Sequence, residues 1–191
     1  TTELVKAVAK VGGNAFVHNY RGRVRREMIK SATIEQMQLQ ADLAMAEMQK
    51  MQDYIAIRGA DNALENCAID GRQMLNYRKI NEDVLNYRVN KTRWCVLRWP
   101  NPSMAQGAKM SSEAFEDFYF EACLADYPKM AKAAQNLVDL MNRTDKVRLV
   151  ANDTDITFSI KDIPAIPCCG NMNIPDGEVY TAPVRNSING V

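Results

Sequence analysis

Glu178 is the residue whose surroundings best suit it for chemistry. A Pro-Asp-Gly turn at residues 175–177 precedes it, and it lies in a predicted strand over residues 177–181. A strand fixes the direction of such a carboxylate, and a hydrolytic metal site needs its ligands held in place before the metal binds. Glu178 is therefore a candidate metal ligand. Without its context, a Gly-Glu pair in a strand is more often part of a solvated face.

Other side chains that could react lack the partners that a site requires. His18, the only histidine, ends a predicted strand next to Asn19. A lone histidine is more often structural than catalytic. Asp153 and Asp155 are not followed by the glycine and glutamate that complete a calcium-binding loop, so we interpret them as turn residues.

The cysteines are expected to be free thiols. The chain has five of them, an odd and scattered set, in a sequence long enough to fold without disulfides. Free thiols indicate a reducing, cytoplasmic location. Cys168 and Cys169 are adjacent, and adjacent thiolates fit one tetrahedral zinc ion poorly. We therefore assign them no metal or redox role.

The overall charge argues against nucleic acid and membrane partners. With 24 basic and 23 acidic residues, the formal charge is +1, which gives no long-range field. The cluster Arg21, Arg23, Arg25 and Arg26 has no interleaved aromatic residues and is interpreted as a solvated helix face. No apolar run approaches the roughly 20 residues that span a bilayer, so the chain is expected to be soluble.

Three successive helix-then-strand units predict an α/β fold. In the second unit, Thr33 and Gln36 form a capping box, and a stripe of methionine and alanine follows at helical spacing, which we interpret as core. Such units imply parallel strands joined by crossovers, as in a doubly wound sheet. The units are a helix through residues 4–11 with strand 15–17, a helix at 33–52 with strand 54–57, and a helix at 73–91 with strand 94–97.

The predicted elements change from helices to β-strands near residue 145, which predicts a second domain. Two helices, at residues 112–124 and 128–141, close the first domain. A hairpin of residues 147–150 and 156–160 follows. We expect an α/β amino-terminal domain at 1–144, with its start missing, and the beginning of a β-rich α+β catalytic domain at 145–191. The chain is thus expected to be a fragment.

The stretch around Glu178 resembles a known family. Residues 173–183 read Asn-Ile-Pro-Asp-Gly-Glu-Val-Tyr-Thr-Ala-Pro, and Arg185, Ser187, Asn189 and Gly190 follow. This sequence resembles the signature of the thermophilic metallo-aminopeptidases, the family of aminopeptidases T and S. Two upstream segments also resemble family segments in the expected order: residues 100–106 and 154–158.

The resemblance implies a metal-dependent aminopeptidase that acts on peptides with a free amino terminus. It implies two divalent metal ions (Zn, Co or Mn), with Glu178 as one ligand, and a homodimer. Two cations would polarise the scissile carbonyl and generate hydroxide near neutral pH. The family's other ligands are expected outside this chain, so no catalytic residue is assigned.

A non-catalytic α/β module for ligand binding or dimerisation is the alternative. A nucleotide-binding module would need a glycine-rich phosphate loop, but the sequence after strand 54–57 is Arg58-Gly59-Ala60-Asp61, with a single glycine. A dimerisation role is compatible with the peptidase hypothesis, because twofold assembly is the commonest arrangement of soluble oligomers.

Overall fold

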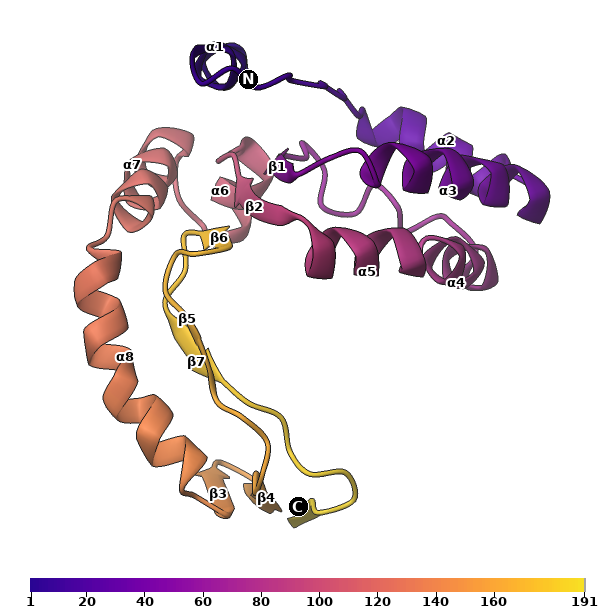
Figure 1. Ribbon diagram of the computed structural model, residues 1–191. Helices are drawn as coiled ribbons and strands as arrows, with labels where there is room; N and C mark the ends of the chain where they lie inside the picture. The colour runs from indigo at the N-terminus through magenta and orange to yellow at the C-terminus, as the bar shows by residue number, and fades with distance from the viewer. Residues whose placement is uncertain (191) are drawn as a thin grey trace. The chain divides into compact units, whose positions relative to one another are not determined.

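The computed structural model describes residues 1–190, and the chain divides into two compact units. The first unit combines residues 1–46 with 64–84. The second combines residues 47–63 with the chain from residue 85 onward. Figure 1 traces the chain through both units, each of which is described by itself below. In residues 1–190, no helix is both long and apolar enough to span a membrane.

The first unit is helical. Ile29, Met37 and Ile69 form its buried cluster, and the side chains of Met74 and Tyr77 pack against them. α2 contacts α4. The helices are α1 (Thr2–Lys10), α2 (Gly22–Ser31), α3 (Ile34–Met48), whose last residues pass into the second unit, and α4 (Gly71–Ile80).

The start of α3 confirms the predicted capping box. The backbone N–H of Gln36 donates to Thr33 Oγ1 at 3.3 Å, and the N–H of Thr33 donates to Gln36 Oε1 at 2.9 Å. The predicted apolar stripe consists of Met37, Ala41, Ala44, Met48 and Met51. Met37 and Ala41 are buried, as predicted, whereas Met51 lies beyond the end of the helix. Two orphan N–H groups are thus satisfied by side chains that lie three residues apart.

Two sequence-based predictions in this region are wrong. Residues 13–21 form neither helix nor strand, and Phe16 and Val17 are exposed, so the strand predicted at 15–17 is not present. Three apolar residues do not make a strand unless a neighbouring strand pairs with them. The helix predicted at 73–91 is two helices, α4 and α5 (Glu82–Lys91), which are separated at Asn81. The carbonyl of Tyr77 accepts both the N–H of Asn81 at 3.2 Å and its Nδ2 at 2.9 Å.

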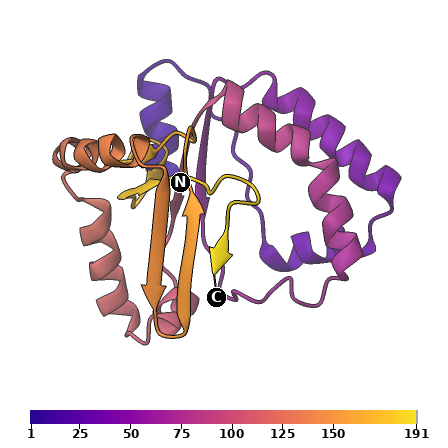
Figure 2. The same cartoon turned by 90° about the horizontal axis from the view of Figure 1, so that it is seen from below.

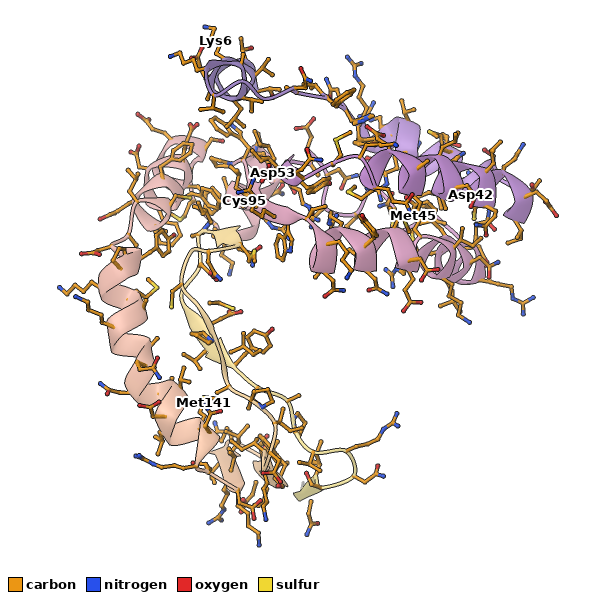
Figure 3. All side chains as sticks on the ribbon, viewed as in Figure 1. Lys6, Asp42, Met45, Asp53, Cys95 and Met141 are labelled. Carbon is orange, nitrogen blue, oxygen red and sulfur yellow. The ribbon has the colours of Figure 1, made fainter. Side chains whose placement is uncertain are left out.

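The second unit contains a parallel sheet, which confirms the α/β class. Its strands are β1 (Asp53–Arg58), β2 (Arg93–Arg98) and β6 (Asn173–Ile174), in the order β1-β2-β6. Asp53 and Cys95, labelled in Figure 3, come from the two longer strands. An ion pair between Asp53 and Arg93 joins the starts of β1 and β2.

Three helices follow β2, and each begins with a side-chain cap. Asn101 caps α6 (Pro102–Gly107), Ser111 caps α7 (Ser112–Cys123), and Asp126 caps α8 (Tyr127–Asn142). Ala105, Phe115 and Tyr119 form a buried cluster between α6 and α7. The helices predicted at 112–124 and 128–141 are thereby confirmed.

Antiparallel strands complete the second unit. The predicted hairpin is confirmed as β3 (Lys146–Ala151) and β4 (Thr154–Ser159), which run side by side in Figure 2, and β8 (Asn189–Gly190) pairs with β4. β5 (Ile166–Cys168) pairs with β7 (Glu178–Tyr180). Figure 1 shows α8 alongside this pair, with which it is in contact. The chain beyond residue 145 also adds β6 to the parallel sheet.

Candidate functional site

A pocket lies at the carboxyl ends of the parallel strands, the edge at which open α/β sheets bind ligands. Its volume is about 580 Å³. Arg58 and Arg98 are the last residues of β1 and β2 and line one part of it. The turn after β6 and the first residue of β7 line the rest. The complete lining is Arg58, Val96, Leu97, Arg98, Asn173, Ile174, Pro175, Asp176, Gly177 and Glu178.

Backbone hydrogen bonds fix the strand ends at this pocket. The N–H of Trp99 donates to the carbonyl of Arg58 at 2.7 Å, which ties β1 to the residue after β2. The N–H of Arg98 donates to the hydroxyl of Tyr119 at 3.2 Å. Burial raises the pKa of Tyr119, and the N–H of Arg98 acts in the opposite direction. The tyrosine is therefore a neutral acceptor at physiological pH.

The Pro-Asp-Gly turn is held by contacts with the preceding loop and with α8. The carboxylate Oδ2 of Asp176 accepts a hydrogen bond from the N–H of Gly170 at 2.8 Å. Gly177 has a φ of +142°, which favours glycine, and Met130 of α8 lies against it. The Ile174–Pro175 peptide bond is cis. The turn that precedes Glu178 is thus held by Gly170 of the preceding loop and by Met130 of α8.

Glu178 lies in a strand, as the sequence predicted, although β7 begins at Glu178 itself rather than at Gly177. Its side chain is exposed at the pocket. It pairs in register with Cys168 of β5. Within residues 1–190, its carboxylate has no hydrogen-bond or ion-pair partner. An exposed carboxylate with free oxygens is suited to zinc, cobalt or manganese.

The same region does not contain a complete metal site in the part of the chain that the structure describes. Residues 1–190 bring no three His, Cys, Asp or Glu side chains together as a metal cluster. Glu178 therefore fits as one ligand of a larger set. Its assignment as a ligand stays a prediction.

Cys168 and Cys169 lie beside the turn as free thiols. Burial raises the pKa of Cys168, and the negative charges of Asp176 and Glu178 raise it further. A thiol with a raised pKa is protonated at neutral pH and is a weak nucleophile.

The remaining sequence candidates lie outside the pocket. His18 stacks on Tyr20, with ring centroids 5.9 Å apart. Arg148 donates two hydrogen bonds to the Asp155 carboxylate, at 2.8 and 2.7 Å. Asp153 has a φ of +53° in the hairpin loop, as predicted, whereas the prediction of Asp155 as a turn residue is wrong, because it lies in β4 and pairs in register with Val150 of β3.

The arginines of α2 contact residues of their own unit. The guanidinium of Arg25 lies 5.7 Å from the ring centroid of Tyr77 and donates to its hydroxyl. Arg26 forms ion pairs with Glu27 and Glu65. These contacts agree with a helix face rather than a phosphate-binding cluster.

Arg58 and Arg98 are the pocket residues that sequence analysis missed. Each directly follows a predicted apolar strand, 54–57 or 94–97. That position is the signal that could have found them, since residues at the carboxyl ends of neighbouring parallel strands lie at one edge of the sheet.

Two comparisons place this fold among known proteins. Residues 1–191 match the family described as thermophilic metalloprotease (M29). The solved structure of wild-type AmpT from Thermus thermophilus is similar, with a TM-score of 0.67 and 17% sequence identity. The match covers 98% of this chain and 54% of that one, so the chain spans about half the length of its structural relative. A search of curated proteins found no match.

Proposed function

Because this chain belongs to the thermophilic metalloprotease (M29) family, we propose that it forms part of a metal-dependent aminopeptidase that removes amino-terminal residues from peptides. The observation that carries this proposal is Glu178, an exposed carboxylate with no partner in residues 1–190, at a pocket on the carboxyl edge of the parallel sheet. Hydrolytic metal sites are built from such carboxylates.

The residues of this chain have two roles in the proposed reaction. Glu178 binds one of two divalent ions, zinc, cobalt or manganese. The hydrogen bond from Gly170 to Asp176 holds the turn that aims Glu178 at the pocket. When bound, the metals supply Lewis acidity and an activated water. The other ligands lie outside residues 1–190. In this proposal the active protein is a homodimer.

The first test is the release of leucine from a leucyl peptide by the full-length protein. We expect activity to disappear on chelation and to return with zinc or cobalt. Glu178→Gln should lose most activity and bound metal, because the amide is a poor zinc ligand, while the circular dichroism spectrum is unchanged. Bound metal is counted by mass spectrometry.

Glu116→Gln provides the matched control. Glu116 is an exposed glutamate of α7 that does not line the pocket. Its substitution should leave metal content and activity unchanged. A Glu178→Gln protein with normal metal content and activity would refute the ligand assignment. Inactivity of the unmodified protein with every metal and peptide would favour the non-catalytic binding module.

A further inference from the structure

Two arginines at paired positions of β1 and β2 line the pocket without a counter-ion from residues 1–190. Arg58 and Arg98 are register partners on neighbouring parallel strands, so their side chains leave the sheet on the same face. Both are exposed, and both line the pocket. The described part of the chain provides no ion pair to either one. Like charges at paired positions of neighbouring strands repel each other, so an anion bound to both arginines would be favoured.

The backbone of this arginine pair is well defined, as a recognition site requires. The carbonyl of Arg58 accepts from Trp99, and the N–H of Arg98 donates to the hydroxyl of Tyr119. Tyr119 is only 6% exposed and packs in the cluster of α6 and α7. The ring of Trp99 packs edge-on against Phe120, with centroids 5.3 Å apart. Both strand ends are thus anchored to the helices.

The rest of the pocket carries the opposite charge. Asp176 and Glu178 line it, but neither approaches Arg58 or Arg98 within 4.0 Å, the limit for an ion pair. The two arginines and the two carboxylates therefore do not neutralise each other through ion pairs. A short peptide at neutral pH has the same separation of charge, with an ammonium group at one end and a carboxylate at the other. The pocket volume of about 580 Å³ is in the usual range for small-molecule sites.

We propose that Arg58 and Arg98 bind a free carboxylate of a short peptide substrate whose amino-terminal residue lies near Glu178. This inference rests on the proposed function and adds a substrate class to it. Planar guanidinium groups bind carboxylates through two parallel hydrogen bonds, which favours a carboxylate over an amide at this position. The carboxylate belongs either to the peptide's carboxyl terminus or to an acidic side chain, and the two sources share this chemistry.

Peptides that differ only in one carboxylate test the inference on the full-length protein. Leucyl-glycine should have a higher kcat/KM than leucyl-glycinamide. In Arg58→Ala and Arg98→Ala, the kcat/KM for leucyl-glycine should fall about ten- to a hundredfold, mainly through KM, because hydrogen bonds between charged groups are lost. The value for leucyl-glycinamide should hardly change. The Lys substitutions keep the charge but not the planar fork, so they should restore part of the preference.

A second pair of peptides distinguishes the two sources of the carboxylate. Leucyl-aspartamide and leucyl-asparaginamide both lack a carboxyl-terminal charge, and only the first has a charged side chain. If the arginines bind an acidic side chain, the kcat/KM of leucyl-aspartamide should be higher than that of leucyl-asparaginamide. If the arginines bind the carboxyl terminus of the peptide, both amides should be equally poor substrates. An advantage of leucyl-aspartamide supports a site for an acidic side chain. Equally poor amides, together with the advantage of leucyl-glycine over leucyl-glycinamide, support a site for the carboxyl terminus.

Arg93→Ala is the matched control, because Arg93 lies at the other end of β2, outside the pocket, in an exposed ion pair with Asp53. It should leave the preference for leucyl-glycine intact. Thermal unfolding of every variant separates a lost site from a lost fold. Equal kcat/KM for leucyl-glycine and leucyl-glycinamide in the unmodified protein and in well-folded arginine variants, with no advantage for leucyl-aspartamide, would overturn the inference.

Binding to the Glu178→Gln protein separates this inference from the proposed function. Calorimetry with leucyl-glycine should show binding that is lost when Arg58→Ala and Arg98→Ala are added. Arginine-dependent binding without hydrolysis by the unmodified protein would refute the peptidase and keep the carboxylate site. Hydrolysis with no dependence on either arginine would keep the peptidase and refute the site.

Discussion

The ring of Tyr127 occupies the space in which a side chain at Gly170 would lie. A Cβ built at Gly170 would be 2.6 Å from Tyr127 Cγ and 2.7 Å from Cδ1. The ring has little room to move away, because the Tyr127 hydroxyl donates to the carbonyl of Ala122 at 3.1 Å. Gly170 also has a φ of +82°. The first residue of α8 thus packs directly on the loop that supports the Glu178 turn.

Gly170→Ala should therefore destabilise the protein by about 1–3 kcal/mol, through steric overlap and backbone strain. Urea unfolding measures the change. Gly107→Ala is the control: no heavy atom lies within 4 Å of its Cβ position, and its φ is not in the left-handed region. That variant should be neutral or slightly more stable, since alanine favours helix. Equal stabilities for the two variants would contradict the packing described.

The carboxylate of Asp176 provides a separate test of the turn. Asp176→Ala leaves the N–H of Gly170 without its acceptor, which should cost about 1–3 kcal/mol in the free energy of unfolding. Asp176→Asn keeps a side-chain oxygen at the same place, so it should lose less than half as much. The urea-unfolding midpoints of the Ala and Asn variants measure this difference in stability. An Ala variant as stable as the Asn variant would show that the hydrogen bond contributes little.

Local patterns in the sequence predicted much of the fold. The capping pair Thr33 and Gln36 lies only three residues apart, so a short stretch of sequence reveals the start of the helix. The apolar runs of β1 and β2 are each bounded by turn residues, so short stretches reveal these strands as well. The strand predicted at 15–17 is wrong because a strand is stabilised by pairing with a distant segment, which a local window does not reveal. The break at Asn81 was missed because the helical spacing of apolar residues continues across it, at Ile80 and Val84, so the apolar pattern contains no sign of two helices.

The site was predicted less completely for the same reason. Glu178 follows a turn whose three residues are consecutive, so the sequence shows it directly. Arg58 and Arg98 are forty residues apart in sequence and become neighbours only through the register of β1 and β2. Each arginine directly follows a predicted strand, but the register that pairs the two strands is not visible in either local sequence. The resemblance at residues 173–183 identified the family but contained no information about this pair.

The core of the first unit depends on Met37, which is 1% exposed and packs with Ile29 and Ile69. Met37→Ala should reduce the free energy of unfolding by about 2–5 kcal/mol, because it leaves a cavity in addition to the lost apolar burial. Leu39, on the same helix, is 60% exposed and provides the control. Leu39→Ala should change stability by less than about 0.5 kcal/mol. Similar losses for both would show that Met37 is not part of a packed core.

The hairpin offers a prediction about pH. Two hydrogen bonds from Arg148 lower the pKa of the Asp155 carboxyl below its usual value. A carboxyl with a lowered pKa in the folded state stabilises that state at pH values above its unfolded pKa. This contribution is lost as the pH falls through the lower, folded pKa. Both side chains are exposed, so salt should weaken the effect.

Arg148→Ala should raise the pKa of Asp155 toward its ordinary value, and carboxyl chemical shifts followed by NMR through an acid titration measure it. Arg148→Lys is the matched comparison, because it keeps the positive charge and loses the two parallel hydrogen bonds. The pKa of Asp155 should then lie between the values in the unmodified protein and the Ala variant. Titration of Asp155 at the same pH in all three proteins would mean that the pair does not persist in solution.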